Sequence, residues 1–235
     1  MINFLKFNEG YENNIKKYSK KDGLLCLLFF IIFILAYSIL AILNVRFDFV
    51  KNNILAFGSI LNIILILIAL VFVKLRGQTL DTIGLYKGKW KTSLIIGIIL
   101  ALIYLFNNCI SYVIQGYTFI DIKKIGVYVI YYLLVSLCEE IAFRGYINTR
   151  INGIIKNKWF AIVLSGVLFI IMHFPYRMIA YGTTLQNLTI DNLGWIIDLF
   201  ITHMIISIIY IRTNSIYGAI IPHWISNLSY HLISR

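Results

Sequence analysis

The stretch GLLCLLFFIIFILAYSILAILN, residues 23–44, contains no charged side chain and decides the fold class. As an α-helix rising about 1.5 Å per residue it would be roughly 30 Å long, the thickness of a bilayer's hydrocarbon core. Inside lipid the backbone must satisfy its own hydrogen bonds, and the stretch lacks the polar alternation of a barrel strand. The sequence therefore predicts a membrane-spanning helix here.

Further apolar runs of similar length follow along the chain. Together the predicted spans are Gly23–Asn44, Ile54–Val73, Ser93–Ile114, Ile125–Ile147, Trp159–Phe174, Leu193–Ile211 and Ile216–Ile233. The predicted fold is an all-α, polytopic transmembrane bundle of about seven helices. Residues 1–235 are expected to form a single integral membrane domain, with residues 1–22 as a cytosolic N-terminal flank.

The composition supports a membrane protein and opposes a nucleic-acid-binding one. Of the 235 residues 60% are hydrophobic and 13% are charged, far from the roughly 25% charged content of soluble domains. The formal net charge is +11, but the basic residues are scattered between apolar runs instead of forming one patch. We therefore expect lipid and a peptide or protein substrate as partners, and no nucleic acid.

The positions of the basic residues predict the orientation, because cytoplasmic segments are enriched in Lys and Arg. With the N-terminus inside, the segments on the inner side carry 14 of the 21 basic residues and the outer segments carry 6. Inner examples are Lys6, Lys87, Lys89 and Arg212, and Arg235 is an outer one. The prediction is a multi-pass cell-membrane protein with a cytoplasmic N-terminus. The N-terminal flank and the loop Lys74–Lys91 are expected to lie on anionic lipid.

Ionisable groups within spans are functional candidates, because a bilayer makes them costly. After the loop charges are removed, the last four spans retain a short list: Glu139, Glu140, Arg144, His173, Asp198, His203, His223 and, near the end, His231. Such groups also mark transport pathways, but transporters of known type show inverted repeats or broken helices, and neither pattern is present here.

Helical spacing sorts the charged groups. Glu140 and Arg144 are four residues apart and should form an ion pair, which leaves Glu139, turned about 140° from Arg144, free to act as a base. A turn between two antiparallel helices is expected near Ile155–Lys158. His173 and the carboxylates are separated from this turn by similar numbers of residues, so they should lie at the same depth in the membrane. A carboxylate and an imidazole at one depth can deprotonate a water.

A second turn, near Arg212–Ser215, places His203 and His223 at matching depths. His223 and Asn227 share a helix face four residues apart, where they can hydrogen-bond an oxyanion.

Three motifs in order, Glu139-Glu140-x-x-x-Arg144, Phe169-x-x-x-His173 and His223-x-x-x-Asn227, resemble those of the CAAX protease and bacteriocin-processing family, also called CPBP or Abi. The resemblance covers residues 125–233, expected to be the protease core. It implies an intramembrane endopeptidase in which Glu139 and His173 activate water while His223 and Asn227 stabilise the oxyanion. Glu140 and Arg144 would hold the helix in place.

The resemblance leaves the cofactor open. We favour a site without a metal, because His223-x-x-x-Asn227 is better suited to donating hydrogen bonds. Zinc is possible, and Glu139, His173 and His223 would then be its ligands. A non-catalytic scaffold or a bacteriocin-immunity protein that kept the fold is the alternative function, and a proton-coupled transporter is less favoured.

Several further residues of the spans lie outside the three motifs. His203 and Ser207 stand where the family often has small residues, so His203 either packs structurally or contributes to the site. Asp198 is interpreted as a supporting or outward-facing group. Cys138 is not expected to be a nucleophile, because its apolar surroundings and an adjacent carboxylate disfavour the thiolate.

Overall fold

The computed structural model describes residues 6–85 and 89–234, so the predicted loop residue Lys87 and the terminal Arg235 lie outside the described residues. In chain order the elements are the helices α1 (Glu9–Lys17), α2 (Lys20–Arg46), α3 (Asp48–Asn52), α4 (Ile54–Leu75), η1 (Leu80–Ile83) and α5 (Trp90–Ile114), the strand β1 (Thr118–Phe119), the helices α6 (Ile122–Glu139), η2 (Glu140–Ile147), α7 (Asn148–Arg150), η3 (Ile151–Gly153), α8 (Lys158–Tyr181), η4 (Asn187–Asp191), α9 (Leu193–Thr213) and α10 (Tyr217–Ser229), and the strand β2 (Ile233–Ser234).

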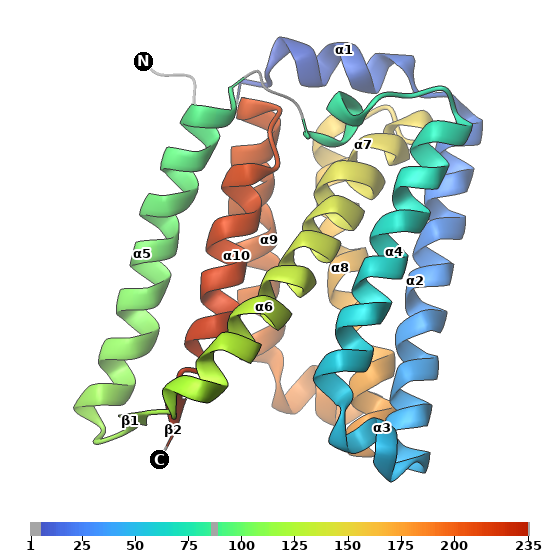
Figure 1. Cartoon of the computed structure of the whole chain (residues 1–235). Helices are drawn as coiled ribbons and strands as arrows, with labels where there is room; N and C mark the ends of the chain where they lie inside the picture. The colour runs from blue at the N-terminus through green and yellow to red at the C-terminus, as the bar shows by residue number, and fades with distance from the viewer. Residues whose placement is uncertain (1–5, 86–88, 235) are drawn as a thin grey trace.

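The long helices stand roughly parallel, and α1 lies across one end of the bundle (Figure 1). Helix α2 packs against α8, α4 against α6, and α5 against α10. Helix α6 crosses the bundle obliquely and contacts both α4 and α10. The described chain begins at the end of the bundle that carries α1 and ends with β2 at the opposite end.

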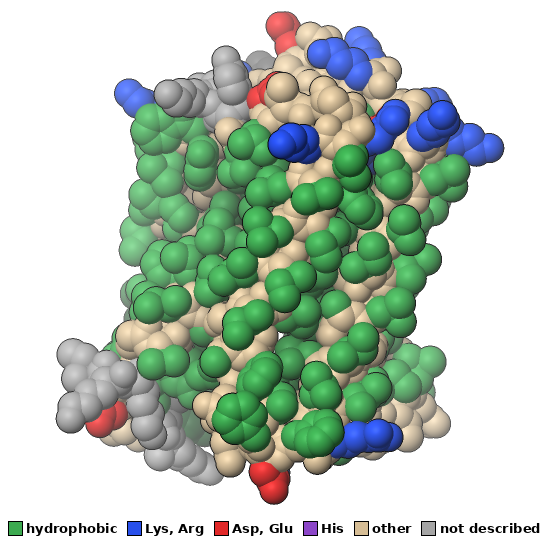
Figure 2. All heavy atoms as spheres, turned by 45° about the vertical axis from the view of Figure 1, so that its right-hand side comes forward, with side chains coloured by type: hydrophobic (Ala, Val, Ile, Leu, Met, Phe, Trp, Pro, Cys, Tyr) green, Lys and Arg blue, Asp and Glu red, His purple; other side chains and the backbone are tan. Residues whose placement is uncertain are grey.

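The outer surface of the bundle is apolar over its middle zone. In each long apolar helix only 17–39% of the most hydrophobic stretch is buried, so most of these side chains face outward. Figure 2 shows a continuous hydrophobic belt, with Lys and Arg side chains gathered mainly at the end that carries α1. A belt of this kind needs lipid as its solvent, which confirms the multi-pass membrane fold.

The predicted count of seven spans is not confirmed. Among the described residues six helices are long and apolar enough to cross a bilayer, the last of them α9. The seventh predicted span, Ile216–Ile233, contains only the 13-residue helix α10, about 20 Å long. Its helix ends at Ser229, and Ile233 pairs instead with Phe119 in a two-stranded antiparallel ladder.

One helix continues beyond its predicted end. Helix α8 was expected to stop at Phe174, before Pro175, but it runs on to Tyr181. Proline removes one backbone donor, and membrane helices tolerate this because neighbouring groups can satisfy the freed carbonyl. The continuation places Arg177 one turn beyond His173 on the same face of α8.

Glycines set the close contact between α5 and α10. A β-carbon built on Gly218 would lie 2.3 Å from the carbonyl oxygen of Ser93, and one on Gly97 would lie 2.8 Å from the α-carbon of Gly218. The hydroxyl of Ser93 accepts a hydrogen bond from the Gly218 amide at 2.9 Å and donates to the Ser215 carbonyl at 3.1 Å. This crossing holds α10, and therefore His223, at a defined depth.

Candidate active site

The carboxylate pair lies where α6 passes into the π-helical segment η2. All eight residues of η2 are buried, and Glu139 directly precedes it. Arg144 donates from Nη1 to Glu140 Oε1 at 2.9 Å, and both side chains are fully buried. The predicted ion pair is present. The regular α-helix expected here is instead a π-helix, a form that is frequent at functional sites.

His223 reaches both carboxylates from α10. Its Nδ1 is 2.6 Å from Glu140 Oε1, and its Nε2 is 3.5 Å from Glu139 Oε2. Because the same Glu140 oxygen accepts from Arg144, it acts as a carboxylate acceptor and Nδ1 of His223 is the donor. Glu139 was expected to point away from the Glu140–Arg144 ion pair. In the structure the His223 imidazole lies between Glu139 and Glu140, so the two carboxylates flank one ring.

His173 lies on α8 with one ring nitrogen engaged. Its Nδ1 is 2.7 Å from the carbonyl oxygen of Phe169. A carbonyl only accepts, so Nδ1 carries the proton and Nε2 has a free lone pair. The ring packs edge-on against Trp195, with the centroids 5.7 Å apart. In the neutral ring, Nε2 is therefore the nitrogen of His173 that can accept a proton.

The ring of Phe169 is the common contact of the cluster. Its centroid lies 5.0 Å from that of His173, 5.4 Å from that of His203 and 6.1 Å from that of His223. The Arg144 guanidinium stands 4.6 Å above the same ring. These contacts gather residues from η2, α8, α9 and α10 around one ring.

A cavity of about 330 Å³ opens onto this cluster. His223 and Asn227, one turn apart on α10, both line it, together with Arg144 and Phe169. Arg177, Trp195 and Asp198 line the remainder of the wall, with others. The cavity thus offers space for a ligand beside His223 and Asn227, whereas Glu139 and His173 are not among its lining residues.

The remaining candidates fall outside the centre of the cluster. His203 is fully buried behind Phe169 and does not line the cavity, and Gly166 makes room for it, because a β-carbon there would lie 3.0 Å from the His203 ring. Asp198 is exposed on the cavity wall. Cys138 is buried beside Glu139.

Several residues of the cavity were not predicted from the sequence, among them Arg177 and Trp195. The Arg177 guanidinium stacks 3.9 Å above the Trp195 ring, and both side chains line the cavity. Arg177 could have been found from its spacing of four residues after His173, had α8 been extended through Pro175. Nothing in the local sequence signals Trp195, which reaches the cavity because α9 folds back against α8.

The three residues named as a possible zinc set do not form a metal site as placed. Across the described residues, no three His, Cys, Asp or Glu side chains are arranged to hold a metal ion. Nε2 of His223 lies 3.5 Å from Oε2 of Glu139, but His173 does not join them in a three-ligand group.

The fold and the cluster define a multi-pass membrane protein with a buried Glu, His and Arg site beside a cavity. Residues 121–229 match the family model described as "Type II CAAX prenyl endopeptidase Rce1-like". Over this C-terminal part, which is 109 of the 235 residues, the chain is similar to the Rce1-like family, and the match supports a membrane-embedded endopeptidase of the CAAX type in general. The family predicted from the three motifs is confirmed. Comparison with curated proteins and with solved structures gave no match.

Proposed function

We propose that the chain hydrolyses peptide bonds by a glutamate-activated water, with Glu139 as the general base. The observation that carries the proposal is the placement of Glu139 and Glu140 on either side of the His223 imidazole, next to a cavity of about 330 Å³. Arg144 neutralises Glu140, whereas no Lys or Arg side chain of the described residues lies within ion-pair distance of Glu139. Glu139 is therefore the carboxylate that remains available to accept a proton.

In this mechanism Glu139 and His173 bind and orient the water. Glu139 takes its proton as the oxygen attacks the scissile carbonyl, and the free Nε2 of His173 accepts a hydrogen bond from the same water. The proton held on Glu139 then passes to the leaving amine. Burial of the site excludes bulk water, which strengthens each of these electrostatic interactions.

His223 and Asn227 are assigned to the oxyanion. Nδ1 of His223 donates to Glu140, and in the imidazolium form Nε2 also carries a proton, so this N–H and the Asn227 amide can donate to an oxyanion in the cavity that both residues line. Donors fixed in this way stabilise the negative charge that develops on the carbonyl oxygen. In this scheme Glu140 and Arg144 act as positioning residues, because they hold His223 without touching the substrate.

The substrate class follows from the position of the cavity within the bundle and from the family. We propose a small peptide precursor or a membrane-anchored protein whose extended segment enters the cavity beside α9 and α10. The protein would lie in the cell membrane with its N-terminus in the cytoplasm, an orientation supported by the gathering of Lys and Arg at the α1 end (Figure 2).

The test uses the purified full chain in liposomes, incubated with synthetic peptides that end in a CAAX sequence, prenylated or not, and mass spectrometry of the products. Cleavage by the wild type and its loss in His173→Gln, with Ser226→Ala as a variant that alters the cavity wall only, would support the proposal. No cleavage of either peptide type or of a general peptide library would favour the scaffold or immunity role.

A further inference from the structure

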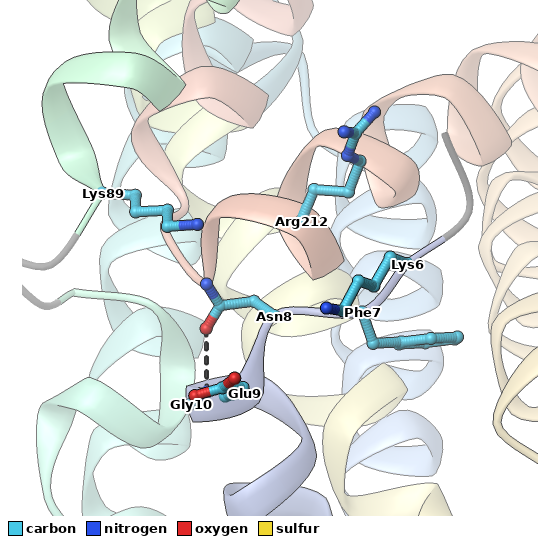
Figure 3. Close-up of a pocket in the computed structure, with 7 residues that line it drawn as sticks. All are labelled: Lys6, Phe7, Asn8, Glu9, Gly10, Lys89 and Arg212. Atoms are coloured by element: carbon cyan, nitrogen blue, oxygen red, sulfur yellow. Dashed lines mark hydrogen bonds between the residues drawn. The ribbon is translucent and has the colours of Figure 1, made fainter. Parts of the chain in front are cut away.

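Positively charged side chains line more than one cavity of the bundle. A hollow of about 590 Å³ lies beside α1, and the residues that line it are shown in Figure 3. Its basic side chains do not converge on one point, because the Arg212 guanidinium is directed away from the hollow. The cavity beside the candidate active site differs, because one cation in its wall, Arg177, is held by a neighbouring ring.

The guanidinium of Arg177 has a fixed position on the cavity wall. Arg177 belongs to the last turns of α8, one turn beyond His173, and its side chain is half-buried. The guanidinium carbon lies 3.9 Å from the centroid of the Trp195 ring. Stacking on an aromatic face covers the flat side of the group and leaves the N–H donors, which lie in its plane, open to a ligand.

These N–H donors have no hydrogen-bond or ion-pair partner among the residues that the structure describes. Asp198 lines the same cavity, but it is exposed and lies beyond ion-pair distance of Arg177. Arg144, the other arginine of the wall, is paired with Glu140. An ionisable group within a membrane span is costly and marks a path for a substrate or ion. Arg177 can therefore pair with a negatively charged group of a ligand.

Arg177 also lies close to the residues assigned to the reaction. The ring centroids of His173 and Trp195 are 5.7 Å apart, and Trp195 contacts the guanidinium directly. The distance from the His173 ring to the guanidinium is thus at most roughly 10 Å, which about three extended residues can span. A cavity of about 330 Å³ is small for a ligand pocket and suits the end of a chain better than a segment that passes through.

We propose that Arg177 binds the C-terminal carboxylate of the substrate and so selects peptides that end shortly after the scissile bond. The inference rests on the proposed function: with the scissile carbonyl at His223 and Asn227, the fragment to be released would extend along the cavity wall to Arg177. A guanidinium and a carboxylate pair through two parallel N–H···O bonds, which a terminal amide cannot reproduce. Trp195 is then a positioning residue, because it orients the guanidinium.

The experiment compares kcat/KM for one peptide sequence made with a free C-terminal carboxylate and with a C-terminal amide, using the purified full chain in detergent micelles. The wild type should prefer the free acid by about 10- to 100-fold, the range expected for hydrogen bonds to a charged group. Arg177→Gln should reduce this preference to within about threefold. The ratio of the two rates does not depend on the folded fraction of a variant, so it separates binding from stability.

Asp198→Asn is the matched control, because it removes one charge of opposite sign from the same cavity wall. Solvent screens this exposed carboxylate, so the preference for the free acid should stay within about threefold of the wild type. A preference that rises with Asp198→Asn as much as it falls with Arg177→Gln would overturn the proposal, because the field of the cavity would then explain it.

A third peptide, amidated and ending in Glu, tests which carboxylate is bound. We expect it to be cleaved as slowly as the plain amide, and cleavage as fast as that of the free acid would overturn the assignment to the chain terminus. Equal rates for acid and amide in the wild type would overturn the carboxylate site and leave the proposed hydrolysis intact. No cleavage of any form would contradict the proposed hydrolysis, and this site with it.

Discussion

Glu140 and His223, 83 residues apart in the sequence, meet at 2.6 Å between Oε1 and Nδ1. The same oxygen accepts a hydrogen bond from Arg144 at 2.9 Å, so one carboxylate joins η2 to α10. The opposite nitrogen of the imidazole is then directed at Glu139. The two carboxylates therefore have different roles: Glu140 positions the His223 ring, and Glu139 remains available to react.

Replacing Glu140 by Gln should strongly destabilise the fold. Arg144 is fully buried, and without its counter-charge the loss is expected to be about 3–5 kcal/mol in the free energy of unfolding. Thermal unfolding in detergent measures it. Glu12→Gln is the control, because Glu12 pairs with Lys158 at the surface, where a pair contributes only about 0–1 kcal/mol. Similar shifts for both variants would contradict the structural role of Glu140.

Replacing Asn227 by Ala should reduce kcat about 100- to 1000-fold with little change in KM. The amide is assigned to charge that appears only in the transition state, so ground-state binding should survive its removal. Steady-state kinetics on a cleaved peptide measure both constants. Ser226→Ala, on the same cavity wall, should keep kcat within a few-fold. A rise in KM alone for Asn227→Ala would show that the amide binds substrate and not the oxyanion.

Treatment with a strong chelator should leave the rate of peptide hydrolysis unchanged. The proposed water is bound by Glu139 and His173, and the candidate ligands do not converge as a metal set. The check compares the purified chain before and after dialysis against chelator. Activity that disappears on chelation and returns with zinc would replace the glutamate mechanism by a metal-dependent one.

Replacing Gly218 by Ala should lower the unfolding temperature and the activity together. The added methyl would lie 2.3 Å from the Ser93 carbonyl oxygen, and such overpacking costs about 1–3 kcal/mol. Gly126→Ala on α6, where a β-carbon meets nothing within 4 Å, is the matched control and should be neutral or stabilising. An unfolding temperature unaltered by Gly218→Ala would mean that α5 and α10 do not rely on this close crossing.

Much of the fold could be predicted from the sequence, because apolar length and turn positions are local properties. The long spans, the Glu140–Arg144 pair and the turns before Lys158 and after Thr213 follow from spacing alone. The shorter α10 could not be predicted, since its apolar run continues beyond the helix into β2.

Two features of the site depend on tertiary structure that no local pattern encodes. The π-helix at Glu140 changes the angular relation of its residues, and a hydrophobicity pattern does not distinguish it from an α-helix. The cavity wall at Trp195 depends on how α9 folds back on α8. The sequence therefore predicted which ionisable groups gather within the bundle better than it predicted what surrounds them.

The rate of peptide hydrolysis by Glu139→Gln, relative to the wild type in the same liposomes, tests the central claim most directly. The substitution keeps the shape of the side chain and removes its basicity, so the account predicts a loss of at least about 100-fold while the protein remains folded. Hydrolysis at the wild-type rate by the folded variant would contradict the account, because no general base would remain where Glu139 is assigned.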